Sequence, residues 1–458
     1  MSFDTIEELM SKAQKAEGRT FGEIDNTGRI KNLRSKGTLG NIIEESFFGY
    51  EVNSVSKPDF ENLGVELKVT PFKKNKNGTY SAKERLVLNI IDYMEEYKLT
   101  FETSSFLKKS IKMLIMLYQY EHDLAINDFR IIKTFLNEFS EEDLAVMRRD
   151  WETIVTKIKN GEAHLISEAD TMYLSACTKG ASKKSVRQQP FSDNMAKQRA
   201  FSLKASYMTG LIRKHLTPEH IEAFSKPGEL NDKTLDEILD ERFKPYYEKR
   251  VDELCNEVAI KHNPRNKSMI PHLMAKLLGV NKNDINQIEE FSKANIKFKT
   301  VCLEPDGKIR EHMSFTHLDF NTLLKEDWEE SDLFNIFSEQ KYLFLVFRFT
   351  EKYKKGLKRI PYFEGIKLWN MPQNNIEGEL YDLWIETRKI VKEGVKLDPK
   401  KNKVNNNLPG SKFNNICHVR SKARNGKDKV ILPDGQSITK QCYWLDRDYV
   451  QKIISNKE

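Results

Sequence analysis

The segment that decides the fold is DFENLGVELKVT, residues 59–70. From Leu63 onward apolar and other residues alternate, which is the period of a half-buried β-strand. Side chains two residues apart project from the same face of a strand, so Glu66 and Lys68 are expected to lie together, opposite the apolar face. Asp59 precedes the strand and can bend back toward Glu66. The segment therefore predicts two carboxylates and one ammonium group at the start of a strand.

The spacing D-(x)6-E-x-K suits a divalent cation. Two carboxylates at this distance form a pocket of hard oxygens, which Mg2+ prefers together with water and phosphate oxygens. A neighbouring lysine can orient the attacking water and stabilise the charge that develops on a pentacovalent phosphate. The residues Asp59, Glu66 and Lys68 therefore predict hydrolysis of a phosphodiester.

The motif alone has little specificity. Residues 96–98 (EYK) repeat the E-x-K pattern elsewhere in the chain, and an edge strand with a solvated polar face would carry it too. Its context favours the functional interpretation. Pro58 and Asp59 form a turn before an otherwise apolar strand, and an acid on a predicted helix, Glu44, precedes that turn.

The rest of the chain predicts an α/β fold (α+β layered). Predicted strands cover 63–69, 86–91, 111–117 and 344–349, and predicted helices cover 40–48, 141–159 and 379–391. Strands interleaved with helices are typical of a layered domain with one sheet covered by helices. Breakers at 217–218 and 225–228 precede a charged stretch, 230–250, that reads as a solvated connecting helix. We therefore expect a domain boundary there.

Length and composition agree with two large domains. The chain has 458 residues, and domains average about 150 residues, which allows two or three. Hydrophobic residues make up 39% and charged residues 31%, which excludes wholesale disorder and fibrous repeats. The net charge of +7 is too dilute over this length to name a polyanionic partner.

The cysteines and the N-terminal segment predict a cytoplasmic protein. Five widely spaced cysteines without a C-x-x-C pair form neither a disulfide framework nor a thiolate metal site. Residues 1–18 carry charges throughout and lack the apolar region of a signal peptide. The most apolar run, residues 342–349, has the length of a strand and contains Arg348. We expect no membrane association.

A faint internal repeat of more than 200 residues relates the two halves of the chain. Gly49 and residues 59–70, 151–161 and 201–212 align with Gly279 and residues 290–300, 384–394 and 443–454. In the second copy, Glu290, Lys297 and Lys299 occupy the positions of the catalytic set. Two lysines and one acid do not hold a divalent cation, so we predict an inert second copy.

Five ordered blocks between residues 20 and 215 resemble the MutH mismatch-repair nickase and the related Sau-type restriction enzymes that cut at GATC. The blocks are KGTLGNIIEESFFG (36–49), DFENLGVELKVTP (59–71), LTFETSSFLKKSIKMLI (99–115), RRDWETIVTKIKNGE (148–162) and RAFSLKASYMTGLI (199–212). Both groups belong to the PD-(D/E)xK nuclease superfamily. The resemblance implies a restriction-endonuclease-like mixed sheet flanked by helices, duplicated as two MutH-like domains of which the second lacks the catalytic set.

The resemblance also implies roles for individual residues. Asp59 and Glu66 would bind the catalytic Mg2+, and Lys68 would be the catalytic lysine. Glu44 would be a further acid that contacts the metal, and Lys109 a further basic residue at the site.

Clustered basic residues predict contact with DNA. Residues 179–214 contain nine basic residues and one acid, and amides such as Gln188 and Gln189 among them can read base edges. In the second half, RSKA (420–423) resembles the R-P-K-A recognition segment of the MutH family more closely than CTKG (177–180) of the first half does. A solvated basic loop is the simpler alternative. The predicted DNA-binding residues are Lys179, Lys183, Lys184, Arg187, Lys204, Arg420, Lys422 and Arg424.

Other catalytic classes find no support in the motifs. The nine histidines form no H-x-x-x-H or H-E-x-x-H pattern, which disfavours a zinc hydrolase. The chain has neither a P-loop nor a G-x-G-x-x-G fingerprint after a strand, which disfavours ATP-driven translocation and dinucleotide chemistry.

We therefore predict a type II restriction endonuclease that hydrolyses DNA with Mg2+ at a short site, GATC by resemblance, and leaves 5'-phosphates. Residues 1–220 are expected to form the catalytic domain, 221–250 a helical linker, and 251–458 an inactive DNA-binding domain that acts as an allosteric effector. Expected partners are double-stranded DNA and a cognate methyltransferase, with a monomer that dimerises on DNA. The alternatives are a mismatch-repair nickase and a non-catalytic DNA-binding regulator. The cut position, the methylation sensitivity and the number of metal ions stay open.

Overall fold

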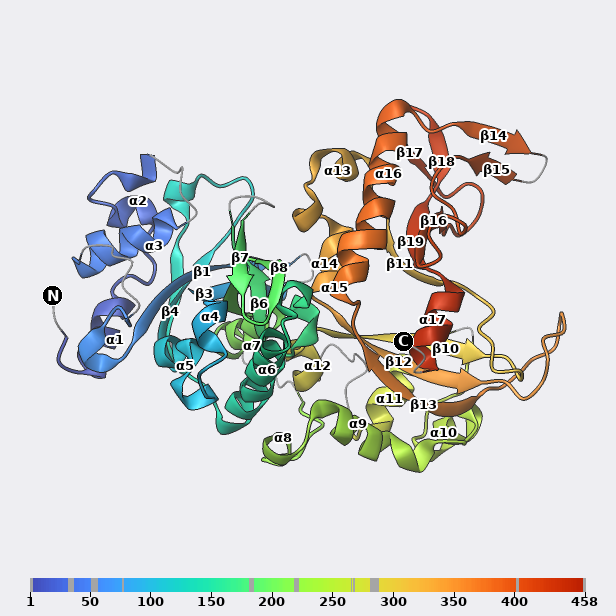
Figure 1. Cartoon of the computed structure of the whole chain (residues 1–458), viewed down its shortest axis with the longest axis horizontal. Coiled ribbons are helices and arrows are strands. Elements are labelled where there is room, and N and C mark those ends of the chain that lie inside the picture. Colours follow the sequence, from blue (N-terminus) through green and yellow to red (C-terminus); the bar gives the residue numbers. More distant parts are fainter. Residues whose placement is uncertain are drawn as a thin grey trace. The chain divides into compact units, whose positions relative to one another are not determined.

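The computed structural model describes residues 3–31, 37–50, 57–75, 78–180, 185–217, 222–264, 266, 268–280, 288–400 and 403–455. The chain divides into two compact units (Figure 1). The first unit comprises Met1–Thr234 and Asn286–Asn295, and the second comprises Leu235–Ile285 and Ile296–Glu458. None of the helices among the described residues has the length and apolar character that crossing a membrane requires.

The first unit is a mixture of helices and short sheets. Its helices are α1 (Ile6–Gln14), α2 (Phe21–Ile24), α3 (Thr38–Ile42), the π-helix η2 (Ile43–Phe48), α4 (Tyr93–Glu96), α5 (Ser105–Ser110), α6 (Glu141–Lys159), α7 (Ala205–Leu216), α8 (Glu229–Asp232) and α12 (Glu289–Lys293). Its strands are β1 (Glu66–Lys74), β2 (Tyr80–Ala82), β3 (Leu86–Ile90), β4 (Lys112–Gln119), β5 (Ile131–Glu138), β6 (Leu174–Thr178), β7 (Val186–Gln189), β8 (Ser192–Lys197) and β9 (Arg199–Leu203).

The sheet of the first unit that carries β1 has the order β2-β1-β4-β5. Strands β1 and β4 are parallel, and β5 returns antiparallel to β4. Side chains from α1, α2, α3 and η2 pack on this sheet, with Ile42, Ile43, Val65, Leu114 and Met116 all fully buried. Glu66 and Leu67 project from opposite faces of β1 and are 2% and 5% exposed, so the start of this strand is covered on both faces.

Strand β1 starts later than its apolar alternation predicts. Residues Glu61–Leu63 form a 3-10 turn, which ends at Gly64 in the left-handed conformation with φ +64°. The strand therefore begins at Glu66, and this carboxylate is only 2% exposed. The predicted strand is confirmed from Glu66 onward but is more than half buried at this end, and the alternative of an edge strand with a solvated polar face is wrong, because neighbouring elements cover the polar face as well.

The predicted connecting helix over residues 230–250 is also wrong. The segment is divided into α8, α9 (Leu235–Phe243) and a 3-10 turn (Lys244–Tyr246). One face of α9 is buried through Leu235, Ile238, Leu239 and Phe243. The many charged residues of this stretch led to the prediction of a solvated helix. The apolar residues between them have helical spacing, however, and form the buried face of α9.

The second unit contains its own set of elements. Its helices are α9, α10 (Val251–Glu257), α11 (Met269–Leu277), α13 (Phe320–Lys325), α14 (Asp332–Ser338), α15 (Gln373–Asn375), the π-helix η11 (Ile376–Leu380), α16 (Tyr381–Glu393) and α17 (Arg447–Ile454). Its strands are β10 (Ile296–Leu303), β11 (Met313–His317), β12 (Lys341–Arg348), β13 (Tyr362–Trp369), β14 (Leu397–Lys400), β15 (Lys403–Asn406), β16 (Cys417–Ser421), β17 (Lys429–Ile431), β18 (Ser437–Thr439) and β19 (Gln441–Leu445).

The two units share a sheet plan. In each, a parallel pair is followed by an antiparallel strand, β1-β4-β5 in the first unit and β10-β12-β13 in the second. Each also has an antiparallel three-stranded sheet, β3-β9-β6 and β11-β19-β16, whose middle strand leads into a helix, α7 or α17. The fold is therefore an α/β restriction-endonuclease-like architecture present twice.

Candidate active site

Asp59 and Glu66 meet because the chain between them forms a closed turn. Phe60 and Val65 exchange two backbone hydrogen bonds, with N···O distances of 2.9 and 3.3 Å. Oδ2 of Asp59 accepts a hydrogen bond of 2.8 Å from the backbone N–H of Leu67. This bond holds the Asp59 carboxylate against the start of β1, beside Glu66.

Two ammonium groups approach one oxygen of Glu66. Its Oε1 lies 2.7 Å from Nζ of Lys68, which donates a hydrogen bond, and 3.4 Å from Nζ of Lys109. Lys109 lies near the end of α5, just before β4, and β4 pairs with β1 through the register Glu66–Met113. The parallel pairing of these strands therefore brings Lys109 to the same carboxylate as Lys68.

Glu44 joins the site from the π-helix η2. This turn ends at Gly49 in the left-handed conformation, φ +77°, and the Glu44 carbonyl accepts the backbone N–H groups of Gly49 and Tyr50. Single π-helical turns are rare and frequently occur at functional sites. Burial, followed by repulsion from the Asp59 carboxylate, raises the pKa of Glu44 to about 7.

Tyr50 is a member of the site that the sequence reasoning missed. Its ring packs edge-to-face against Phe60, with the ring centroids 5.6 Å apart. Its hydroxyl is buried and has no hydrogen-bond partner among the described residues, and burial with the charges of Asp59 and Glu44 raises its pKa far above the ordinary value. The sequence feature that could have identified Tyr50 is its position directly after Gly49, which ends the helix that carries Glu44.

The residues at this site fit a divalent cation. Asp59, Glu66 and Glu44 supply carboxylate oxygens, and the second oxygen of Glu66, Oε2, is buried without a hydrogen-bond partner in the described part of the chain. Burial also raises the pKa of Glu66, although Lys68 opposes this shift. An orphaned buried oxygen among mutually repelling carboxylates gains both a partner and charge compensation when a cation binds.

The raised pKa of Glu44 predicts a pH-dependent stability of the metal-free chain. In the unfolded chain this carboxyl has an ordinary pKa near 4.5, whereas in the folded chain the value is about 7. Between these pH values the folded state holds a proton that the unfolded state has released, so folding stability should fall as pH rises through this window.

Glu44→Gln, which cannot ionise, should lack this contribution. We expect the urea midpoint of the Gln variant, relative to that of the unsubstituted chain, to rise between pH 4.5 and 7 in the presence of EDTA. Subtracting the two curves removes the other carboxyls that titrate in this range. A constant difference between the curves would contradict the raised pKa.

The second unit carries lysines where β1 carries its acid and lysine. Glu66 pairs with the second residue of β4, Met113, and Lys297 pairs with the second residue of β12, Tyr342. Lys299 donates a hydrogen bond of 2.8 Å to the Ser314 carbonyl, and burial lowers its pKa to about 8. No carboxylate therefore replaces Glu66 at its structural position in this unit.

Glu290, the remaining acid of the aligned set, has a structural role in the first unit. It is 2% exposed, and it accepts hydrogen bonds from the backbone N–H groups of Phe224 and Ser225 and from the Ser225 hydroxyl. Its carboxylate is therefore engaged in holding α12 to the segment that follows α7.

The second E-x-K pattern, residues 96–98, is structural. Glu96 is 2% exposed, and its Oε1 accepts hydrogen bonds from Nε1 of Trp151 at 2.7 Å and from the backbone N–H of Ser105 at 3.3 Å. This acid anchors α6 and α5, and it is not available to a substrate.

The predicted DNA-binding residues of the first unit have different environments. Lys179 is exposed and Arg187 is partly buried on β7, while Lys183 and Lys184 lie outside the described residues. Lys204 does not fit the predicted role. It is 5% exposed, and its Nζ donates a hydrogen bond of 2.6 Å to the Thr171 carbonyl, so its charge is directed into the protein.

The amides flanking the basic residues also differ in exposure. Gln188 is exposed, but Gln189 is 5% exposed. Its side chain accepts a hydrogen bond from the Ala163 N–H and donates one to the Asn194 carbonyl. Gln189 therefore supports the β7-β8 hairpin, and Gln188 is the amide available to a ligand.

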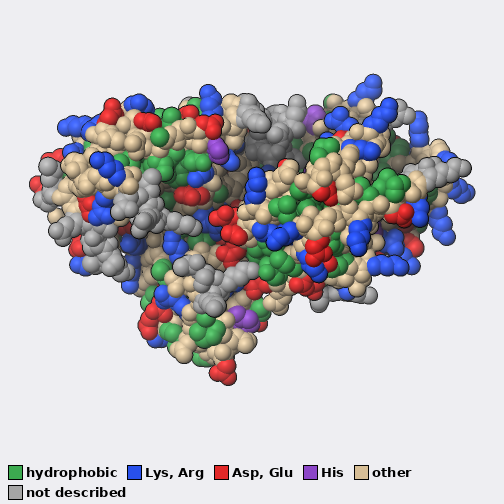
Figure 2. Space-filling model, turned by 90° about the horizontal axis from the view of Figure 1, so that it is seen from above, with side chains coloured by type: hydrophobic (Ala, Val, Ile, Leu, Met, Phe, Trp, Pro, Cys, Tyr) green, Lys and Arg blue, Asp and Glu red, His purple; other side chains and the backbone are tan. Residues whose placement is uncertain are grey.

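The basic segment of the second unit is exposed. Arg420, Lys422 and Arg424 all lie at the surface on or after β16. The Arg420 and Lys422 cations lie 5.6 and 6.0 Å from the centre of the Trp444 ring. On the face drawn in Figure 2, lysine and arginine side chains alternate with acidic ones, so surface charge alone does not single out a DNA-binding strip.

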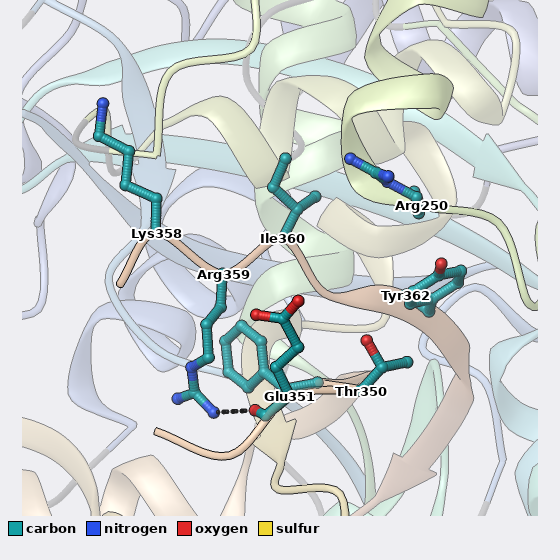
Figure 3. A pocket seen from close by; sticks show the side chains of 8 residues that line it. Arg250, Thr350, Glu351, Lys358, Arg359, Ile360 and Tyr362 are labelled. Atoms are coloured by element: carbon teal, nitrogen blue, oxygen red, sulfur yellow. Dashed lines mark hydrogen bonds between the residues drawn. The ribbon is translucent and has the colours of Figure 1, made fainter. Parts of the chain in front are cut away.

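The pocket in Figure 3 does not have the character of an active site. This cavity of about 220 Å³ in the second unit is lined by Arg250, Lys358 and Arg359, among others. Arg359 forms an ion pair with Glu304 and donates a hydrogen bond to the Glu351 carbonyl, and Arg250 pairs with Asp252. Both guanidinium groups therefore have internal partners.

Comparisons with known proteins agree with this architecture. Residues 48–150 match the family model described as "DNA mismatch repair enzyme MutH". The chain is 36% identical to "Type II restriction enzyme Sau3AI" of Staphylococcus aureus over 99% of both chains. It is 32% identical to "DNA mismatch repair protein MutH" of Shewanella woodyi and 28% identical to that of Shigella flexneri, covering 45% and 46% of this chain and 91% and 93% of the relatives.

A carboxylate pair with a lysine on an interior strand of a mixed sheet, in a chain that matches MutH, defines an enzyme of the MutH-like endonuclease class. The full-length similarity is more specific than the class. The chain belongs to the MutH/Sau3AI-type restriction endonuclease family.

Proposed function

We propose that this enzyme cleaves double-stranded DNA at GATC with Mg2+ and leaves 5'-phosphates. The observation that carries the proposal is the site at the start of β1. There Asp59 is fixed by the Leu67 N–H, Glu66 has one oxygen without a partner, and Lys68 contacts the other oxygen. The proposed target sequence rests on similarity to Sau3AI and MutH, and its chemistry rests on these residues.

Asp59, Glu66 and Glu44 would hold Mg2+, which supplies a positive charge next to the scissile phosphate and a water of lowered pKa. The side chains of the protein provide the remaining chemistry. Lys68 lies close enough to Glu66 to orient the attacking water and to stabilise the charge that develops on the phosphate oxygens. Lys109 adds a second positive charge on the same side of Glu66.

The two units would have different functions, catalysis in the first and DNA binding in the second. The first unit, which extends to Thr234 and includes Asn286–Asn295, would form the catalytic domain, and the second unit would form a DNA-binding domain that stimulates cleavage. The loss of carboxylates on β10 and the exposed basic residues Arg420 and Lys422 support this division. Each cation that neutralises a phosphate makes the affinity fall with salt, with a slope of about −0.9 per phosphate.

The proposal includes the cellular context of a restriction enzyme. A chain with one active site must pair on DNA or act twice to cut both strands, so we propose a monomer that dimerises on its site. A cognate methyltransferase would protect the host's own GATC sequences, and both enzymes would act on DNA in the cytoplasm.

Plasmids with no, one or two GATC sites test the proposal. We expect Mg2+-dependent linear product from the plasmids with sites, no product from the plasmid without them, and faster cleavage when two sites are present. Nicked circles as the final product would favour the mismatch-repair nickase, which is the principal alternative. Gel-shift binding without any cleavage would favour a non-catalytic regulator, and equal rates on one and two sites would exclude the effector role.

A further inference from the structure

Three side chains that the proposed function does not use converge in the second unit. His312 precedes β11, His418 lies on β16, and Asp446 follows β19. Their possible ligand atoms all lie within 4.8 Å of one another. Oδ2 of Asp446 is 3.5 Å from Nδ1 of His312 and 3.9 Å from Nδ1 of His418.

The environment of His418 indicates that this cluster binds a ligand. The residue is 1% exposed, and neither ring nitrogen has a hydrogen-bond partner among the residues that the structure describes. A buried imidazole without partners costs free energy, because water satisfied both nitrogens before folding. The His312 ring faces it edge-on, with ring centroids 4.6 Å apart, and so supplies no hydrogen bond to it.

Strand pairing identifies the positions of the first unit that are equivalent to these three residues. Leu86 and Leu174 both pair with Leu203 in the first unit, and Met313 and Cys417 both pair with Leu445 in the second. By this register the positions of His312, His418 and Asp446 correspond to Arg85, Ser175 and Lys204.

The three residues of the first unit all have protein partners. Arg85 pairs with Glu168, the Ser175 hydroxyl bonds with that of Ser202, and Lys204 donates to a carbonyl. The second unit has replaced this set with two imidazoles and a carboxylate, which leave buried nitrogens unpartnered.

We propose that His312, His418 and Asp446 form a binding site for a transition-metal ion of the Zn2+ type. Two imidazoles and one carboxylate are a common donor set for zinc and are poorly suited to Mg2+, which prefers oxygen. Bond lengths of 2.0–2.1 Å separate the ligand atoms of a tetrahedral zinc site by about 3.3–3.4 Å. The two observed distances to Oδ2, 3.5 and 3.9 Å, require only small adjustments.

The surroundings permit the ion to enter and bind. His312 lines a cavity of about 570 Å³, so one of the three ligands borders open space. Burial lowers the pKa of both histidines, that of His418 to about 4, and so favours the neutral rings that bind a metal ion. His312 Nδ1 accepts the Arg447 N–H at 3.1 Å and would have to give up this bond. Arg447 is the first residue of α17, where the N–H has no partner within the helix and can turn to water.

The site would act as a clamp in the second unit. It would join the residue before β11, the second residue of β16 and the N-terminal cap of α17 through one ion. Since such a site exists only in the folded chain, the ion should stabilise the second unit.

Cobalt(II) binding to the full-length chain tests the proposal. We expect one Co2+ per chain with the visible absorption of a tetrahedral nitrogen and oxygen site, measured with excess Mg2+ present to occupy the carboxylates of the first unit. Zn2+ should displace the cobalt and raise the Tm by about 2–4 °C. Neither effect depends on cleavage of DNA.

Substitutions locate the ion. Asp446→Asn keeps the oxygen that caps α17 by accepting the Asp448 N–H, and His312→Gln changes a partly exposed side chain. Both variants should therefore fold and should lose the absorption and the Zn2+-dependent rise in Tm. His317→Gln, at an exposed position on β11, is the matched control and should keep both. No absorption with the unsubstituted chain, or equal absorption in all three variants, would overturn the proposal.

Discussion

Glu66→Gln is expected to reduce the rate of DNA cleavage by about 10³-fold or more, because a lost metal ligand forfeits several kcal/mol of transition-state stabilisation. The substitution preserves the size of the side chain and one oxygen. It removes the negative charge that pairs with Lys68 and Lys109 and that would hold the cation. Single-turnover cleavage of a duplex with one GATC site, at saturating enzyme, measures the chemical step without binding or product release.

Two controls separate chemistry from folding and DNA binding. Glu61→Gln alters an exposed acid in the turn between Asp59 and Glu66, which pairs with the exposed Lys57, and this variant should cleave at the normal rate. Gel-shift affinity of Glu66→Gln for the same duplex should be within a few-fold of the unsubstituted chain. Cleavage by the Gln variant at an undiminished rate would show that the active site lies elsewhere.

Asp150→Ala is expected to destabilise the first unit by about 3 kcal/mol, because buried N–H groups that lose their acceptor cost about 1–3 kcal/mol each. Asp150 lies on α6 and is 4% exposed. Its carboxylate accepts the backbone N–H groups of Met172, Tyr173 and Leu174 at 2.6, 2.7 and 2.9 Å. It is therefore the contact that fastens β6 to the longest helix of the unit.

Hydrogen exchange of peptides from the first unit measures this effect without assuming that the whole chain unfolds in one step. Protection of the amides in residues 172–174 should fall most. Asp150→Asn keeps one acceptor oxygen and should lose less, and Glu152→Ala, at an exposed position of the same helix, should lose nothing measurable. Equal losses for Ala at positions 150 and 152 would contradict the proposed role of the carboxylate.

Patterns over a few residues were sufficient to predict the parts of the site that come from nearby positions in the sequence. The i, i+2 spacing of Glu66 and Lys68 predicted their contact, and Asp59 was expected to bend back to the strand. Helix α6, Glu141–Lys159, was predicted to the residue from its apolar spacing. These features depend on the spacing of residues within a single strand or helix, and that spacing can be read from the sequence.

Long-range features required either a family resemblance or the structure. Glu44 and Lys109 were assigned by resemblance, since the π-helical turn and the sheet bring them to Glu66. Lys204 was misassigned because a cluster of charges does not reveal which ammonium group turns inward to a carbonyl. In the triad, His312 lies more than 100 residues before His418 and Asp446, at spacings that no metal motif describes.

The most direct test of the account is to sequence the DNA ends that the full-length chain produces with Mg2+ from a duplex containing one GATC site. The account predicts one defined cleavage position per strand at GATC, with 5'-phosphate ends, and no such ends with Asp59→Ala. Ends at other sequences, or the same ends from the Asp59→Ala chain, would contradict the claim that the carboxylate site of the first unit cleaves DNA at GATC.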